Sequence, residues 1–454
     1  PDTYPRELQR VKAYLALHNV YGVDLNETAV ELAEVSLWLN VMYPGLQAPW
    51  FGLHLRRGNS LVGTRRALYS PDAVKKGEWL KSAPKEVPFR DGDIPEGYIH
   101  HWLLPAQGWG SVAGEKEAKN LAPEETKKLG DWRKSMRKRP KDGKGKGTQL
   151  KRLQGLSRRA EYLWGWVIRR LELSEQEISR HIKVYGADWI KEPENPLSRD
   201  EVKNRLERKG SPYWRLKTVM DAWCALWFWP VQKAGLLDGS YDIYGRLERS
   251  LEVSASGADS LFDTGQRSSK SLADLDEWLD FAESVLGSHD IPDDSLYEGQ
   301  IHTLDQLDEA EDFLPGYMGM VEFYKLGEKF PWLAVSESLA KKHGFFHWEL
   351  QFSHLFKNRG GFDIQVGNPP WVRPSWDEDS VLAEVDPWFK LSDRVAVDVK
   401  QGRKEGVLES RATSGYYLNE VAAVAGLSDF LSGIVTYPLL AGTQPDLYRA
   451  FMCH

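Results

Sequence analysis

The chain has 454 residues, of which 41% are hydrophobic and 28% charged, and its net charge is -7. A length of this order predicts more than one module and at least one complete hydrophobic core. The mild acidity excludes a histone-like protein that coats nucleic acid, but it is compatible with DNA binding through a local basic surface.

The cysteine content and the hydropathy argue against a secreted or membrane protein. The two cysteines, Cys224 and Cys453, lie far apart without histidines at ligand spacing, so we expect neither a disulfide framework nor a metal site. No apolar run approaches the roughly 18 residues that span a bilayer, and the start shows no signal pattern. We therefore expect a cytoplasmic protein. The chain begins without Met and stops inside an expected helix, which indicates a piece of a longer protein.

An α/β pattern covers residues 1–63. Residues 19–25 predict a short strand that ends in a carboxylate, and residues 29–39 predict a helix that follows a capping Asn. Residues 54–56 predict a second strand, which leads into the glycine-flanked turn at residues 58–63.

Residues 64–344 have a different texture and predict a large, mainly helical insertion. An aromatic cluster in it has helical spacing, so we expect a packed core rather than a base-stacking surface. Its members are Trp164, Trp166, Trp223, Trp227, Phe228 and Trp229. The clearest helical patterns cover residues 161–173, 214–229, 274–286 and 303–314.

A basic, glycine-rich stretch at residues 131–159 interrupts these helices. It contains 12 Lys or Arg against 2 Asp, and we predict a mobile loop. Two interpretations stay open, a solvated charged face and a contact with the DNA backbone. The candidate DNA-binding residues are Arg137, Lys138, Arg139 and Lys141.

A predicted strand at residues 361–367 leads directly into Asn368, Pro369, Pro370 and Trp371. Methyl transfer to an exocyclic amine needs acceptors for the amine hydrogens and a planar wall for the unstacked base. The Asn side chain and the first Pro carbonyl are acceptors, the prolines fix the backbone, and the indole can stack on a base. Two prolines after a strand also form ordinary structural turns.

Residues 361–371 resemble motif IV of the amino-methyltransferases, and residues 346–356 are similar to the segment that precedes it in large Type IIG restriction–modification enzymes. The methyltransferases of the BREX and DISARM phage-defence systems share this segment. The resemblance implies a Rossmann-like α/β methyltransferase fold with a large helical insertion. It also implies S-adenosyl-L-methionine-dependent methylation of adenine N6 in double-stranded DNA, within a restriction or phage-defence system, which can include further subunits.

Two earlier segments resemble the cofactor motifs of the same family. Residues 21–26 are similar to the second-strand motif, whose carboxylate takes the cofactor ribose, and residues 58–63 to the third-strand motif, which meets the cofactor adenine. The resemblance implies four cofactor-binding residues, Asp24, Leu25, Asn59 and Ser60. An Asp at a strand end is also a common turn residue, and Gly-Asn-Ser is a common turn tripeptide.

The family's glycine-rich first motif has no counterpart in residues 1–20, and the glycines at 143–147 have no preceding strand. We therefore expect that residues 1–454 alone would not bind S-adenosylmethionine. Residues 444–451 resemble the helix that follows motif IV, so residues 345–454 are expected to continue the methyltransferase domain.

Two alternatives stay open. A protein-glutamine methyltransferase uses a similar tetrapeptide, typically with Tyr and in a smaller chain, and a non-catalytic DNA-binding or scaffold subunit could retain the fold. The sequence leaves open whether the insertion recognises the DNA target. His347 and Trp348 are expected in the domain interior or at the docking surface of the insertion, without a catalytic role.

Overall fold

The computed structural model describes residues 4–46, 51, 53–143, 147–178, 182, 199–244, 269–291, 300–391 and 395–453. It is mainly helical, with 62% helix and 4% strand. The helices are α1 Tyr4–Asn19, α2 Glu27–Val41, α3 Pro71–Lys76, α4 Lys116–Leu121, α5 Pro123–Met136, α6 Gln149–Ile178, α7 Arg199–Leu206, α8 Pro212–Ala225, α9 Ala234–Leu237, α11 Leu275–Leu286, α12 Leu304–Met318, α13 Phe323–Lys329, α14 Leu333–His343, α15 Trp348–Gln351, α16 Ser353–Arg359, α17 Glu378–Ala383, α18 Trp388–Leu391, α19 Val397–Leu408, α20 Arg411–Ser432 and α21 Leu447–Met452.

Within the described residues, the strands form two small sheets. Strands β1 (Gly22–Asp24) and β2 (Leu55–Arg57) pair in parallel. Strand β3 (Ala67–Tyr69) lies between β4 (Lys85–Glu86) and β5 (Ile99–His100), antiparallel to both. Both strands predicted in the N-terminal segment are therefore confirmed.

The predicted helix after β1 is also confirmed, and its start has the expected cap. The Asn26 side-chain oxygen accepts hydrogen bonds from the backbone N–H groups of Thr28 at 2.9 Å and Ala29 at 3.4 Å. These bonds satisfy donors that the first helical turn leaves without partners. The cap thus fixes the direction in which the chain leaves β1.

The expected Rossmann-like sheet is not clearly shown, and one predicted strand is wrong. Residues 361–367 run as an irregular segment without strand pairing. Ile364 and Val366 are 82% and 90% exposed, although their alternation with polar residues is typical of a half-buried strand. A strand is stabilised by hydrogen bonds to a neighbouring backbone and by cover over its apolar face. The described residues supply no paired backbone to this segment, and of its three apolar side chains only Phe362 packs against other rings, among them Tyr21 and Phe352.

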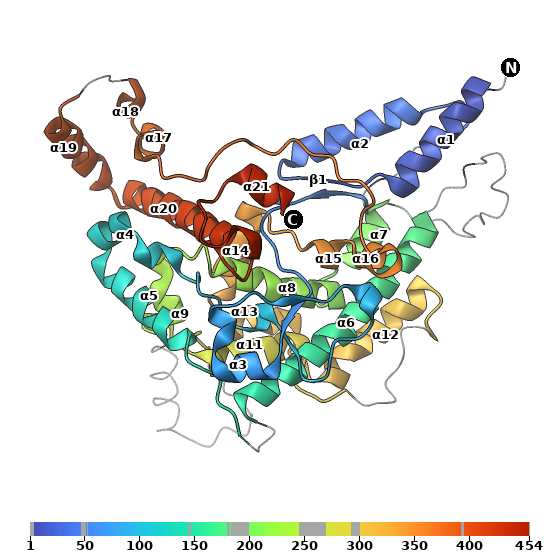
Figure 1. Ribbon diagram of the computed structural model, residues 1–454, viewed down its shortest axis with the longest axis horizontal. Coiled ribbons are helices and arrows are strands. Elements are labelled where there is room, and N and C mark those ends of the chain that lie inside the picture. The colour runs from blue at the N-terminus through green and yellow to red at the C-terminus, as the bar shows by residue number, and fades with distance from the viewer. Residues whose placement is uncertain are drawn as a thin grey trace, which may run out of the picture.

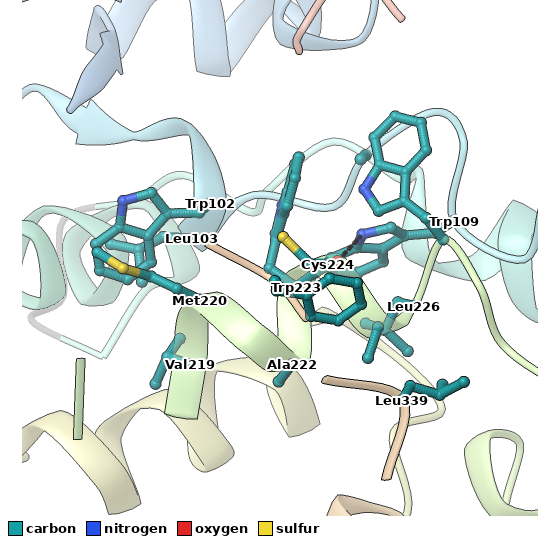
Figure 2. Close-up of a cluster of buried hydrophobic side chains, with 14 of the residues drawn as sticks. Trp102, Leu103, Trp109, Val219, Met220, Ala222, Trp223, Cys224, Leu226 and Leu339 are labelled. Carbon is teal, nitrogen blue, oxygen red and sulfur yellow. Dashed lines mark hydrogen bonds between the residues drawn. The ribbon is translucent and has the colours of Figure 1, made fainter. Parts of the chain in front are cut away.

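All four helical patterns predicted in the insertion are confirmed, in α6, α8, α11 and α12. Their apolar faces form one large core, part of which Figure 2 shows around Trp223 and Trp109. The Trp109 indole donates a hydrogen bond to the Trp223 carbonyl at 3.0 Å. All six aromatic residues of the predicted cluster are buried, so the interpretation as a packed core is confirmed.

The basic stretch is only partly the loop that was predicted. Helix α5 continues to Met136 and helix α6 begins at Gln149, so the irregular segment is confined to residues 137–148, of which residues 144–146 lie outside the described residues. Buried apolar residues at helical spacing, such as Trp132 and Leu153, hold both ends in helices. The prediction of a loop over residues 131–159 followed from their charge and glycine content, whereas the spacing of their apolar residues favours helix at both ends.

Figure 1 shows how these elements are arranged. Helices α6, α8 and α11 form the body of the molecule, and α1 and α2 project from its upper side beside β1. The segment between α16 and α17 runs across the same side, next to α21. Helix α3 and the chain that follows α5 lie on the lower side. Within the described residues, no helix combines the length and the apolar character needed to cross a bilayer.

Candidate active site

The parallel pairing of β1 with β2 brings the two predicted cofactor motifs together. Asp24 lies opposite Arg57 in the register, and the Gly58 N–H donates to the Asp24 carbonyl at 2.9 Å. Asn59 follows immediately, so both polar residues lie at the carboxyl ends of neighbouring strands. This is the edge at which parallel sheets commonly bind ligands.

Each of these two side chains also shapes its own turn. One Asp24 carboxylate oxygen accepts from the Asn26 N–H at 2.7 Å, and the Asn59 side-chain oxygen accepts from the Leu61 N–H at 3.1 Å. Asp24 is exposed and Asn59 is half-buried. The turn role of both residues is therefore observed, while their contact with a cofactor stays a prediction.

The chain returns to this edge after α14. Gly344 ends α14 with a φ of +65°, a conformation that favours glycine, and its carbonyl accepts from the Asn59 N–H at 2.6 Å. The Phe346 N–H then donates to the Val62 carbonyl at 2.8 Å. These bonds dock the segment that leads to motif IV against the second cofactor motif.

Leu25 and Ser60, the other two predicted cofactor residues, lie at the same edge. Leu25 is about half exposed. The Ser60 carbonyl accepts from the Trp348 indole at 3.0 Å, so Trp348 joins the two predicted parts of the methyltransferase domain to each other.

A cleft of about 610 Å³ opens beside β1, within the size range of small-molecule sites. Gly22, Val23 and Ser60 line one part of it, and residues of the 361–366 segment line another. Asp24, Leu25 and Asn59 are not among the lining residues. Asn368 to Trp371 do not line it but follow it directly along the chain. The structure thus brings the segment before motif IV next to the first cofactor motif.

Glu349 lines this cleft, and the sequence reasoning missed it. Its carboxylate accepts a hydrogen bond from the Arg66 backbone N–H, and burial raises the pKa of Glu349 to about 7. A carboxyl group that is half protonated near neutral pH can donate or accept a hydrogen bond. The sequence shows only a single Glu among aromatic residues, and this pattern does not predict a buried carboxyl group with a raised pKa.

His347, in contrast, ties the surrounding structure together. Its Nδ1 accepts from the Thr64 N–H at 3.0 Å, and its Nε2 lies 3.0 Å from a carboxylate oxygen of Asp221. Asp221 also accepts from Lys217 at 2.6 Å. Burial lowers the pKa of His347. The imidazole therefore links the turn after β2 to α8, as expected of an interior residue.

In the Asn-Pro-Pro-Trp segment, Pro369 is half-buried and the other three residues are exposed. Trp371 stacks on Tyr448 of α21, with ring centroids 5.1 Å apart and planes inclined by 26°. A Cβ at Gly367 would overlap the Phe451 ring, so glycine is needed where α21 approaches. The predicted helix after motif IV is present, and it packs against the motif.

The predicted DNA-binding residues lie elsewhere. Residues 137–141 follow α5 on the lower side of Figure 1, away from β1 and α21. The Arg137 guanidinium donates to the Gln107 carbonyl, and burial lowers the pKa of Arg137 to about 10. Lys138, Arg139 and Lys141 are exposed.

One segment of the chain is similar to a known methylase family. Residues 271–392 match the family model of the Eco57I restriction-modification methylase. The match includes the docked segment after α14 and the Asn-Pro-Pro-Trp segment, and it begins inside the stretch predicted as an insertion. It supports DNA methylation in a restriction–modification system. No curated protein and no solved structure matches the chain.

Proposed function

We propose that this protein methylates the N6 amino group of adenine in DNA, with S-adenosyl-L-methionine as methyl donor, within a restriction–modification or phage-defence system. The observation that carries the proposal is the exposed Asn-Pro-Pro-Trp segment, which directly follows the residues that line the cleft beside β1. The family match over the same residues supports it.

The acceptor side of the reaction rests on this segment. The Asn368 side-chain oxygen and the Pro369 carbonyl would accept the two amino hydrogens and draw the nitrogen out of conjugation with the ring. The exposed indole of Trp371 would hold the base after it leaves the duplex. No strong base is required, because the proton can leave after the nitrogen has become positively charged.

The donor side rests on Asp24 and Asn59, with Leu25 and Ser60 beside them. A carboxylate suits the two hydroxyls of a ribose, and an amide can donate to and accept from an adenine edge. Their adjacent positions at the strand ends fit the nucleoside part of S-adenosylmethionine. When bound, this compound supplies an activated methyl group.

Methyl transfer from labelled S-adenosylmethionine to DNA tests the proposal in the intact protein. Asn368→Ala is expected to lower kcat by about 100-fold or more, because an oriented polar contact at the reacting nitrogen is lost. Asn120→Ala, at an exposed position of α4, is the matched control and should leave activity unchanged. Wild-type protein that binds DNA but transfers no methyl group would instead favour a non-catalytic subunit.

A further inference from the structure

Trp371 presents one covered and one open face. Its ring stacks on Tyr448, yet the residue is 75% exposed. Because a stacking partner covers one face of an indole, the opposite face is in contact with solvent. A planar group can therefore add to the stack without displacing Tyr448.

One arginine contacts this aromatic pair, and a second follows Trp371 by two positions in the sequence. Arg449 donates from Nε to the Tyr448 hydroxyl at 3.1 Å, and its guanidinium lies 5.8 Å from the Tyr448 ring centre. Arg373 donates to the Gln444 side chain at 3.1 Å and lies 3.4 Å from the Asp446 carboxylate. Its side chain is still 61% exposed. Arg449 is exposed too, so both guanidinium groups are accessible to solvent, Arg449 beside the Tyr448 ring and Arg373 at the start of α21.

Helix α21 makes a backbone hydrogen bond and a packing contact with the segment around Asn368 to Trp371. The Leu447 N–H donates to the Val372 carbonyl at 3.3 Å, and the Phe451 ring fills the space above Gly367. These contacts hold Tyr448 against the indole, and Arg449, the next residue, lies beside the Tyr448 ring.

We propose that Trp371, Tyr448, Arg373 and Arg449 form a binding surface for a DNA strand that carries an unstacked base. The base lies on the open face of Trp371, Tyr448 supports the indole from behind, and the two arginines contact the adjoining phosphates. Aromatic rings with neighbouring cations are the usual means of holding single-stranded nucleic acid. The inference rests on the proposed function and adds α21 to the site.

The position of the other basic residues supports this surface. The phosphates next to an extruded base reach the protein on the same side as that base, and residues 137–141 lie on the other side of the molecule (Figure 1). Arg449, in contrast, contacts Tyr448 of the stack, and Arg373 contacts Asp446, which precedes Tyr448 by two residues.

The test is the affinity of the intact protein for a labelled deoxyadenosine hexanucleotide and for an abasic hexanucleotide with the same phosphates, measured by fluorescence anisotropy at several salt concentrations. Tyr448→Ala is expected to weaken binding of the deoxyadenosine strand about tenfold and to leave the abasic strand unaffected. Tyr448→Phe keeps the stack and should bind the deoxyadenosine strand as the wild type does. Arg449→Gln should reduce the slope of log affinity against log salt by about 0.7.

Tyr324→Ala is the matched control, because Tyr324 is exposed and has Lys325 5.5 Å from its ring centre, but lies on α13. It should change neither affinity. If Trp371→Ala weakens binding while Tyr448→Ala and Arg449→Gln do not, the role of α21 is refuted and the proposed function stands. If Asn368-dependent methyl transfer is absent but Tyr448→Ala still weakens binding, the surface stands and the proposed function fails.

Discussion

At the scale of single residues, Asp24 and Asn59 each combine a structural bond with an available polar group. Asp24 uses one carboxylate oxygen for the Asn26 N–H, and Asn59 uses its side-chain oxygen for the Leu61 N–H. The common turn role and the cofactor role are therefore compatible, since the turn fixes the direction in which the rest of the side chain points.

Substitution of Asp24 by Asn separates these two roles. Asn keeps an acceptor for the Asn26 N–H, so stability should change little, while the charge that suits a ribose diol is lost. We expect the KM for S-adenosylmethionine to rise at least about tenfold, since hydrogen bonds to charged groups contribute roughly 1.5–3 kcal/mol. The control is Glu27→Gln, which removes a charge from the first turn of α2, the helix that follows Asp24. An equal rise in both variants would contradict the assignment.

His347 predicts a specific pH dependence of stability. Its pKa in the folded protein is below the ordinary value of 6.5, because burial disfavours the charged form. The folded state thus binds fewer protons than the unfolded state between the two pKa values, so this contribution is present above pH 6.5 and is lost as the pH falls through the folded pKa. His347→Gln should flatten that part of the profile.

Urea unfolding between pH 5 and pH 7.5 measures this effect. The difference in free energy of unfolding between wild type and His347→Gln should shrink as the pH falls. His354 also has a pKa lowered by burial, and because His347 is not among the causes of that shift, His354 contributes equally to both proteins and cancels in the difference. A difference that is constant over the whole range would show that His347 does not titrate as argued.

At the scale of elements, the contact between α21 and the motif segment depends on one glycine. Helix α21 has only six residues and needs packing to be stable. Gly367→Ala would drive a Cβ into the Phe451 ring, so we expect α21 to detach and a destabilisation of about 1–3 kcal/mol.

Gly406→Ala is the matched control, since it lies in α19 and a Cβ added there would meet nothing within 4 Å. It should raise stability by up to about 1 kcal/mol through helix propensity. Limited proteolysis near residue 446 reports on α21 directly. Unchanged cleavage in Gly367→Ala would mean that α21 does not depend on this contact.

Element by element, the sequence predicted what local periodicity determines. The helices in α6, α8, α11 and α12 follow from apolar residues at helical spacing, and the cap at Asn26 follows from its side-chain chemistry. The strand predicted at residues 361–367 failed, because strands depend on partners that are distant in the sequence. Glu349 and Tyr448 were missed for the same reason, since only the fold brings them to the cleft and to Trp371.

At the scale of the whole molecule, the motif segment and the basic residues 137–141 occupy different sides (Figure 1). If the basic segment contacts a duplex, it does so at a distance from the reacting base. Replacing Lys138, Arg139 and Lys141 by Gln should then reduce the salt slope of duplex binding by about 2.7. Titrations at several salt concentrations measure the slope, and an unchanged slope would leave these residues as a solvated face.

The identity of the methylated nucleoside tests the central claim most directly. Unmethylated genomic DNA is incubated with the intact protein and S-adenosylmethionine, digested to nucleosides and analysed by mass spectrometry. The account predicts N6-methyldeoxyadenosine, formed by the wild type and absent with Asn368→Ala. Methylation of cytosine instead, or N6-methyldeoxyadenosine formed equally by Asn368→Ala, would contradict it.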